Sequence, residues 1–224
     1  MSNHNRMPDM PDPKIRISSL VQRGNDLFVA CRRDRIELEA RGLEWKDVEE
    51  LARLVQDCSS SEALWKLAGE KSAAETAKLE AFARECRQFR NSVVDKLRAA
   101  QQLLPAGFPA PQFKKSGGRA ELVQDLHDLH VLCRIYNVQL KKASFDLELG
   151  QKAYEESRKL SLMCAQTVLL REDLNESKYK RNALCNRMYS IIKDICALGR
   201  SVFAKDPRIQ DYYSGKPRSK SQKA

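Results

Sequence analysis

Three potential metal ligands follow one another at three-residue steps near the middle of the chain. They are His127, His130 and Cys133, within the run DLHDLHVLC. Each three-residue step on a helix shifts a side chain by about 60° around the axis, so these ligands do not stack as those of an HExxH or ExxH site do. His127 and His130 are therefore weak metal candidates, and the alternative is a pair of ordinary histidines on a helix flank. We predict no metal and no cofactor.

The seven cysteines offer no better catalytic site. Their number is odd and they form no CxxC pair, which argues against a disulfide framework and a zinc ribbon. Most of them lie on or beside apolar stripes, where a buried thiol is unreactive. The chain also lacks a GxSxG nucleophile motif, a GxGxxG motif and a glycine-rich phosphate loop. We therefore predict no catalytic residue and expect a protein that is not an enzyme.

The strongest pattern is an internal repeat with an offset of 102 residues. Leu20–Arg32 has the sequence LVQRGNDLFVACR and Leu122–Arg134 has the sequence LVQDLHDLHVLCR, with eight identities in register. Apolar residues in both copies recur at three- and four-residue steps, as in amphipathic helices. We therefore predict an all-α fold: an antiparallel up-and-down bundle of long helices, built from two related helical hairpins.

Proline, glycine and the polar ends divide the chain into five predicted segments. A helix of about 15–41 and another of about 45–104 form the first hairpin, and three serines at 59–61 suggest a break in the second of these helices. The second hairpin covers 119–206, but the pattern does not locate its turn. A disordered leader (1–14), a proline- and glycine-rich linker (105–118) and a basic disordered tail (207–224) complete the division.

The repeated helices carry a second stripe opposite the predicted core. Val29 and Ile36 lie on this side in the first copy, and Val131 and Val138 lie on it in the second. A helix with two such stripes can be contacted from two sides, and the alternative is an inherited surface without a role. The predicted interaction surface consists of Gln22, Asp26, Val29 and Arg32 with Gln124, Asp128, Val131 and Arg134.

Basic residues exceed acidic ones by ten, which is compatible with a polyanion partner. They are concentrated between Arg84 and Arg119 and in the C-terminal tail, and the alternative interpretation is a solvated helix face with a flexible tail. The possible polyanion contacts are Arg84, Arg87, Arg90, Lys114, Lys115, Lys216, Arg218, Lys220 and Lys223. No zinc-finger, helix-turn-helix or RNA-binding sheet motif accompanies them, so any such binding would be directed at the phosphate backbone.

These observations favour a non-catalytic interaction or scaffold protein that associates with itself or with another protein. A basic accessory protein that binds nucleic acid is the alternative. No segment has the length and apolarity of a signal peptide or a membrane span. We therefore expect no membrane partner and a soluble, cytoplasmic protein.

Overall fold

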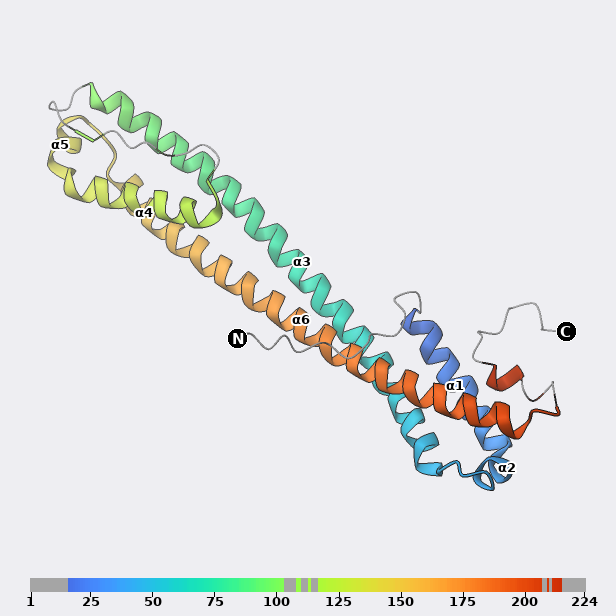
Figure 1. Cartoon of the computed structure of the whole chain (residues 1–224). Coiled ribbons are helices and arrows are strands. Elements are labelled where there is room, and N and C mark those ends of the chain that lie inside the picture. Colours follow the sequence, from blue (N-terminus) through green and yellow to red (C-terminus); the bar gives the residue numbers. More distant parts are fainter. Residues whose placement is uncertain are drawn as a thin grey trace, which may run out of the picture. The chain divides into compact units, whose positions relative to one another are not determined.

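The computed structural model describes residues 16–102, 108–109, 113, 117–206, 209 and 211–214 (Figure 1). The predicted leader, most of the linker and most of the C-terminal tail lie outside these residues.

Helices account for all the regular structure of the described residues, and no strand occurs among them. This confirms the predicted all-α fold, with long helices that pack against other helices. The helices are α1 (Ile17–Arg33), α2 (Arg35–Glu39), α3 (Trp45–Gln101), α4 (Arg119–Ile135), α5 (Asn137–Lys142) and α6 (Glu148–Val202), followed by the short 3-10 helix η1 (Asp211–Tyr213).

The chain forms two compact units, and each unit contains residues from both predicted hairpins. Unit 1 comprises residues 1–68 and 174–224, and unit 2 comprises residues 69–173. The two long helices α3 and α6 therefore each contribute one segment to unit 1 and one segment to unit 2. The predicted division into five segments stays a prediction.

Each unit has its own apolar core, in which leucine predominates. In unit 1, Leu27 of α1 is buried with Leu51 of α3 and Met188 of α6. In unit 2, Leu129 of α4 is buried with Leu79 of α3 and Leu160 of α6. The stripes predicted from three- and four-residue spacing are therefore the surfaces that pack together and exclude water. Burial of these apolar side chains is the main contribution to the stability of each unit.

The short helices of the two units are interrupted at corresponding positions. Asp34 separates α1 from α2 with φ −102° and ψ 24°, and Tyr136, 102 residues later, separates α4 from α5 with φ −102° and ψ 25°. The backbone N–H of Asp34 still donates to the Ala30 carbonyl, and that of Tyr136 to the Leu132 carbonyl. The chain therefore changes direction at both places while its helical hydrogen bonds continue.

The turn that the sequence pattern did not locate lies at Ser144. Gly42 ends the corresponding segment of unit 1 with φ 97°, and Ser144, 102 residues later, has φ 58°. The next residue closes the turn in both cases, because Leu43 N–H donates to the Leu38 carbonyl at 3.0 Å and Phe145 N–H donates to the Leu140 carbonyl at 2.9 Å. A serine in the left-handed region gives no sequence signal, since glycine is the residue expected there.

The helix break suggested by the serines at 59–61 does not occur. Helix α3 continues through them, and the Ser59 hydroxyl donates to the Val55 carbonyl at 2.8 Å. Serine can satisfy its hydroxyl within a helix in this way, so a serine run ends a helix only when the surrounding contacts favour a break.

Both tryptophans of the chain lie in unit 1 and each is covered by an arginine. The guanidinium carbon of Arg35 lies 4.1 Å from the ring centre of Trp45, and that of Arg181 lies 4.0 Å from the ring centre of Trp65. These distances are typical of cation–π contacts.

Candidate interaction surfaces

The second stripe predicted on the repeated helices is exposed in both units. Val29 is 66% exposed and Ile36 is 81% exposed, while Val131 and Val138 are 38% and 60% exposed. Ile135, which the sequence analysis did not single out, adds a further apolar side chain on α4 at 65% exposure. Single exposed apolar side chains are ordinary, but here they recur at the same seven-residue spacing in two units.

A hydrogen-bonded Gln–Asp pair precedes the apolar residues of each stripe. The amide of Gln22 donates to the Asp26 carboxylate at 2.8 Å, and the amide of Gln124 donates to the Asp128 carboxylate at 2.7 Å. The last polar residues of the predicted surface, Arg32 and Arg134, are exposed. All eight predicted residues therefore reach the surface at least in part, four on α1 and four on α4.

The two histidines of α4 flank an aromatic ring and do not converge on a common point. The ring centres of His127 and His130 are 6.5 Å apart, and His130 stacks on Tyr154 of α6 at 4.8 Å. Nδ1 of His130 lies 3.1 Å from the Gly150 carbonyl. Within the described part of the chain, no group of three or more His, Cys, Asp or Glu side chains is arranged to hold a metal ion.

All seven cysteines are free, and six of them are buried. Burial raises the pKa of Cys133 to about 11, and burial together with nearby carboxylates raises the pKa of Cys86 to about 12. A thiol that stays protonated at neutral pH is a poor nucleophile. Cys164 is the one cysteine with partial exposure.

The predicted polyanion contacts have different environments. Arg84 is exposed and Arg87 is half-buried on α3, and neither forms an ion pair with a described residue. Lys114, Lys115, Lys216, Arg218, Lys220 and Lys223 lie outside the described residues.

Arg90 is a correction to this set, because it belongs to the interior of unit 2. Its side chain is only 4% exposed, and its guanidinium donates to the Asp125 carboxylate of α4 at 2.5 Å. A cation that is buried and neutralised by an internal carboxylate does not present its charge to a polyanion. Sequence alone could not show this, since the partner lies 35 residues away.

A second buried arginine has the same local arrangement in unit 1. Arg181 donates to its neighbour Asn182 at 3.0 and 3.2 Å, just as Arg90 donates to Asn91 at the same two distances. Arg181 also bonds the Glu62 carboxylate of α3 at 3.1 Å. The dipeptide Arg-Asn occurs at both sites, and this repetition is the sequence signal that could have identified them.

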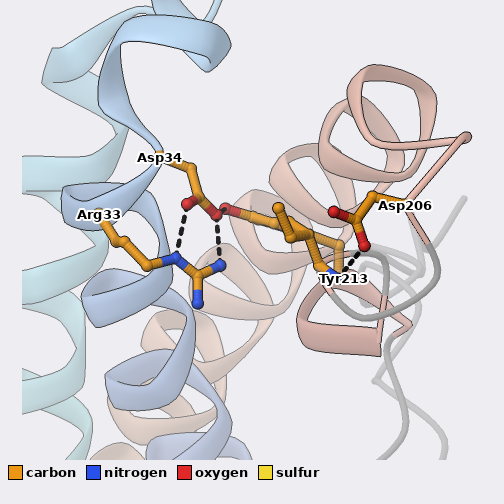
Figure 2. Close-up of polar contacts among 5 residues, drawn as sticks. Arg33, Asp34, Asp206 and Tyr213 are labelled. Atoms are coloured by element: carbon orange, nitrogen blue, oxygen red, sulfur yellow. Dashed lines mark hydrogen bonds and ion pairs between the residues drawn. The ribbon is translucent and has the colours of Figure 1, made fainter.

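Tyr213 of η1 is anchored to the interruption between α1 and α2 (Figure 2). The hydroxyl of Tyr213, a fully buried residue, donates to the Asp34 carboxylate at 2.9 Å, and Arg33 donates to both oxygens of that carboxylate at 2.6 Å. Gly199 makes room for the aromatic ring, because a Cβ atom there would lie 2.3 Å from a ring carbon of Tyr213. Burial and the Asp34 carboxylate raise the pKa of Tyr213 above its ordinary value.

No known protein family matches the chain, and neither the curated proteins nor the solved structures include one that is significantly similar to it. None of the described helices combines the length and apolarity that crossing a membrane requires.

Proposed function

We propose that this protein is a non-catalytic helical interaction protein that associates with itself through the second stripes of α1–α2 and α4–α5. We further propose that its bundle arose from two related helical hairpins. The observation that carries the proposal is the pair of exposed apolar residues at Val29 and Ile36, which recurs at Val131 and Val138. Leaving these four side chains in water costs free energy that a partner surface would recover.

The repeated placement of these residues also favours self-association over an unrelated partner. A face that occurs twice in one chain can meet its own copy across a two-fold axis, as closed dimers require. The cores of the two units have not kept identical side chains: Gly24 and Val55 of unit 1 correspond to Leu126 and Ser157 of unit 2. Val29 and Val131 are identical, and Ile36 and Val138 are both β-branched, beside core positions that differ.

The oligomeric state of Val29→Glu combined with Val131→Glu tests this proposal. Size-exclusion chromatography with light scattering should give a mass above the 25.6 kDa of one chain for the wild type, and about one chain for the variant. The matched control is Leu64→Glu combined with Leu67→Glu, since both leucines are exposed on α3 away from the stripes. A monomeric wild type, or a variant that keeps the wild-type mass, would contradict the proposal.

The second candidate function is binding to a nucleic acid backbone through the Arg84–Arg119 region and the C-terminal tail. The absence of ion pairs at Arg84 and Arg87 among the described residues favours it, because their charges remain available to phosphates. Arg84→Gln combined with Arg87→Gln should weaken binding of a labelled duplex and lower its salt dependence. Binding that is unchanged in this variant and in a chain truncated after residue 214, or that ignores added salt, would rule this function out.

A further inference from the structure

An open groove runs between α4 and the part of α6 that belongs to unit 2. Its volume is about 760 Å³, and Val123 and His127 of α4 line one side while Tyr154, Arg158 and Leu162 of α6 line the other. Most of its wall is apolar, and its polar groups are cations, hydroxyls and amides. Apart from Gln124, its lining residues lie outside the proposed self-association surface.

The floor of this groove is formed by small residues. Ser157, Ser161 and Ala165 line the groove at four-residue steps along α6, so they share one side of the helix over about two turns. Small side chains in a row allow another helix to approach closely, and a groove between two helices suits a third helix.

The positive charges of the groove are not neutralised within the described protein. Arg158 lies over the Tyr154 ring at 5.8 Å and Lys159 over the Phe82 ring at 4.2 Å, and neither forms an ion pair with a described residue. None of the described residues that line the groove carries a carboxylate. The carboxylates of Asp128 and Glu155 accept hydrogen bonds from the amides of Gln124 and Gln151.

A related groove in unit 1 provides an internal comparison. Val21, Gln22 and Ser59 line it, and the residues 102 positions later, Val123, Gln124 and Ser161, line the groove of unit 2. In unit 1 a carboxylate lines the groove, since Glu62 belongs to the lining and pairs with Lys66 at 3.3 Å and with Arg181 at 3.1 Å, while Arg16 is a third cation of the lining.

The residues that differ between the two units change the charge of the groove of unit 2. Arg158 and Lys159 correspond to Gln56 and Asp57, and His127 corresponds to Asn25. The aromatic ring of Tyr154 replaces Ala52 at the same offset. Unit 2 has therefore gained cations and an aromatic surface at the place where unit 1 keeps a neutral or acidic side chain.

We infer that the groove between α4 and α6 in unit 2 binds an acidic amphipathic helix of a partner protein. The apolar side of that helix packs on Val123, Leu162 and the small floor residues. Its carboxylates meet Arg158 and Lys159 at the rim, where charge complementarity sets the orientation of the helix. This inference goes beyond self-association, and the two can fail separately.

Fluorescence anisotropy with a model peptide tests the inference on the full-length protein. The probe is a labelled helix of about 20 residues, with leucine along one side and glutamate elsewhere. Arg158→Gln combined with Lys159→Asp installs the residues of unit 1. This variant should raise the Kd of the peptide about tenfold, and its Kd should no longer depend on salt concentration. The matched control, Arg16→Gln combined with Lys66→Asp in the groove of unit 1, makes the same change of charge and should leave Kd unchanged.

A steric variant separates charge from shape. Ser161→Trp fills the floor of the groove without changing its charge. It should weaken binding of the peptide at least as much as the charge variant does, whereas Ser59→Trp in unit 1 should not weaken it. Circular dichroism checks that each variant is folded. Light scattering should show that all four variants have the same oligomeric state as the wild type.

Three results would overturn the inference. The first is an absence of saturable binding of the acidic peptide to the wild type, and the second is equal binding of a peptide in which lysine replaces glutamate. The third is a Kd that neither Arg158→Gln with Lys159→Asp nor Ser161→Trp changes. Dodecanoate that binds in this groove where the acidic peptide does not would assign the site to a small amphipathic carboxylate and refute a helical partner.

Discussion

Arg90 and Arg181 are the two buried arginines among the described residues, and each crosses from one helix to a carboxylate on another. Both also donate to the asparagine that follows them in sequence, so each guanidinium joins a local partner to a distant one. Loss of one partner from a buried ion pair is strongly destabilising, because it leaves the other charge buried without compensation. The stability of the protein should therefore be sensitive to replacement of Arg90 or Arg181.

Replacement of Arg90 should therefore destabilise the protein strongly. Arg90→Met leaves the Asp125 carboxylate without its cation, and we expect a loss of about 3 kcal/mol in the free energy of unfolding. Urea denaturation followed by circular dichroism measures this loss. Arg84→Met is the control, since Arg84 is exposed. If the two variants had equal urea midpoints, the Arg90–Asp125 contact would not be a stabilising one.

Tyr213 makes a smaller contribution that depends on pH. Tyr213→Phe removes the donor to Asp34 and should cost about 1–3 kcal/mol at neutral pH, whereas Tyr189→Phe on the surface should cost nothing measurable. The raised pKa of Tyr213 means that the unfolded chain loses this phenolic proton first, from about pH 10 upward. The stability difference between wild type and Tyr213→Phe should then decrease as the pH rises above 10. A difference that grows with pH would contradict the buried hydrogen bond.

The cysteines should react with thiol reagents in two classes. Cys164 is partly exposed and should react rapidly with Ellman's reagent, while the six buried thiols should react only on unfolding. Cys164→Ala should abolish the fast phase and leave the slow one. More than one fast thiol in the wild type would show that a second cysteine is accessible.

At the scale of the helices, periodicity was sufficient to predict the long apolar stripes but not the interruptions. The stripes through Leu27 and Leu129 are buried as expected, because a 3.6-residue period reports directly which side meets the core. The turn at Ser144 and the continuity of α3 through Ser59 escaped prediction, since each depends on contacts made after the chain folds. The groove cations Arg158 and Lys159 also escaped it, because a groove between two helices does not appear in the pattern of either one.

Exchange of the turn residues should shift stability in opposite directions. Ser144→Gly relieves a left-handed serine and should stabilise the protein by up to about 1 kcal/mol, whereas Gly42→Ser imposes the same strain and should destabilise it by about 1 kcal/mol. Thermal melts of the two variants provide the comparison. Shifts of the same sign would mean that the two turns are not equivalent.

At the scale of the whole molecule, the two units are assembled differently, because the core of unit 1 combines two distant stretches of the chain whereas the core of unit 2 lies within the continuous stretch 69–173. Unit 1 requires the last part of α6 to cover α1 and the start of α3, and unit 2 requires the last part of α3 to cover α4 and the start of α6. Neither predicted hairpin contains all of the core of either unit.

Two fragments that correspond to the predicted hairpins should therefore not fold separately. Residues 16–102 lack the α6 side chains of unit 1, and residues 117–214 lack the α3 side chains of unit 2. Each fragment alone should show low helicity and no cooperative melt, and mixing them should restore both. Circular dichroism measures the change, and a fragment that melts cooperatively by itself would contradict this dependence.

The placement of Trp45 and Trp65 gives the molecule a built-in spectroscopic label. Because both indoles of the chain belong to unit 1 and each carries an arginine on its face, selectively excited tryptophan emission reports on that unit and not on unit 2. Far-ultraviolet ellipticity, in contrast, records the helices of both. Superposition of the two denaturation curves would mean that the long shared helices make the units unfold as one, and a separation of the curves would give the stability of each unit without any engineered probe.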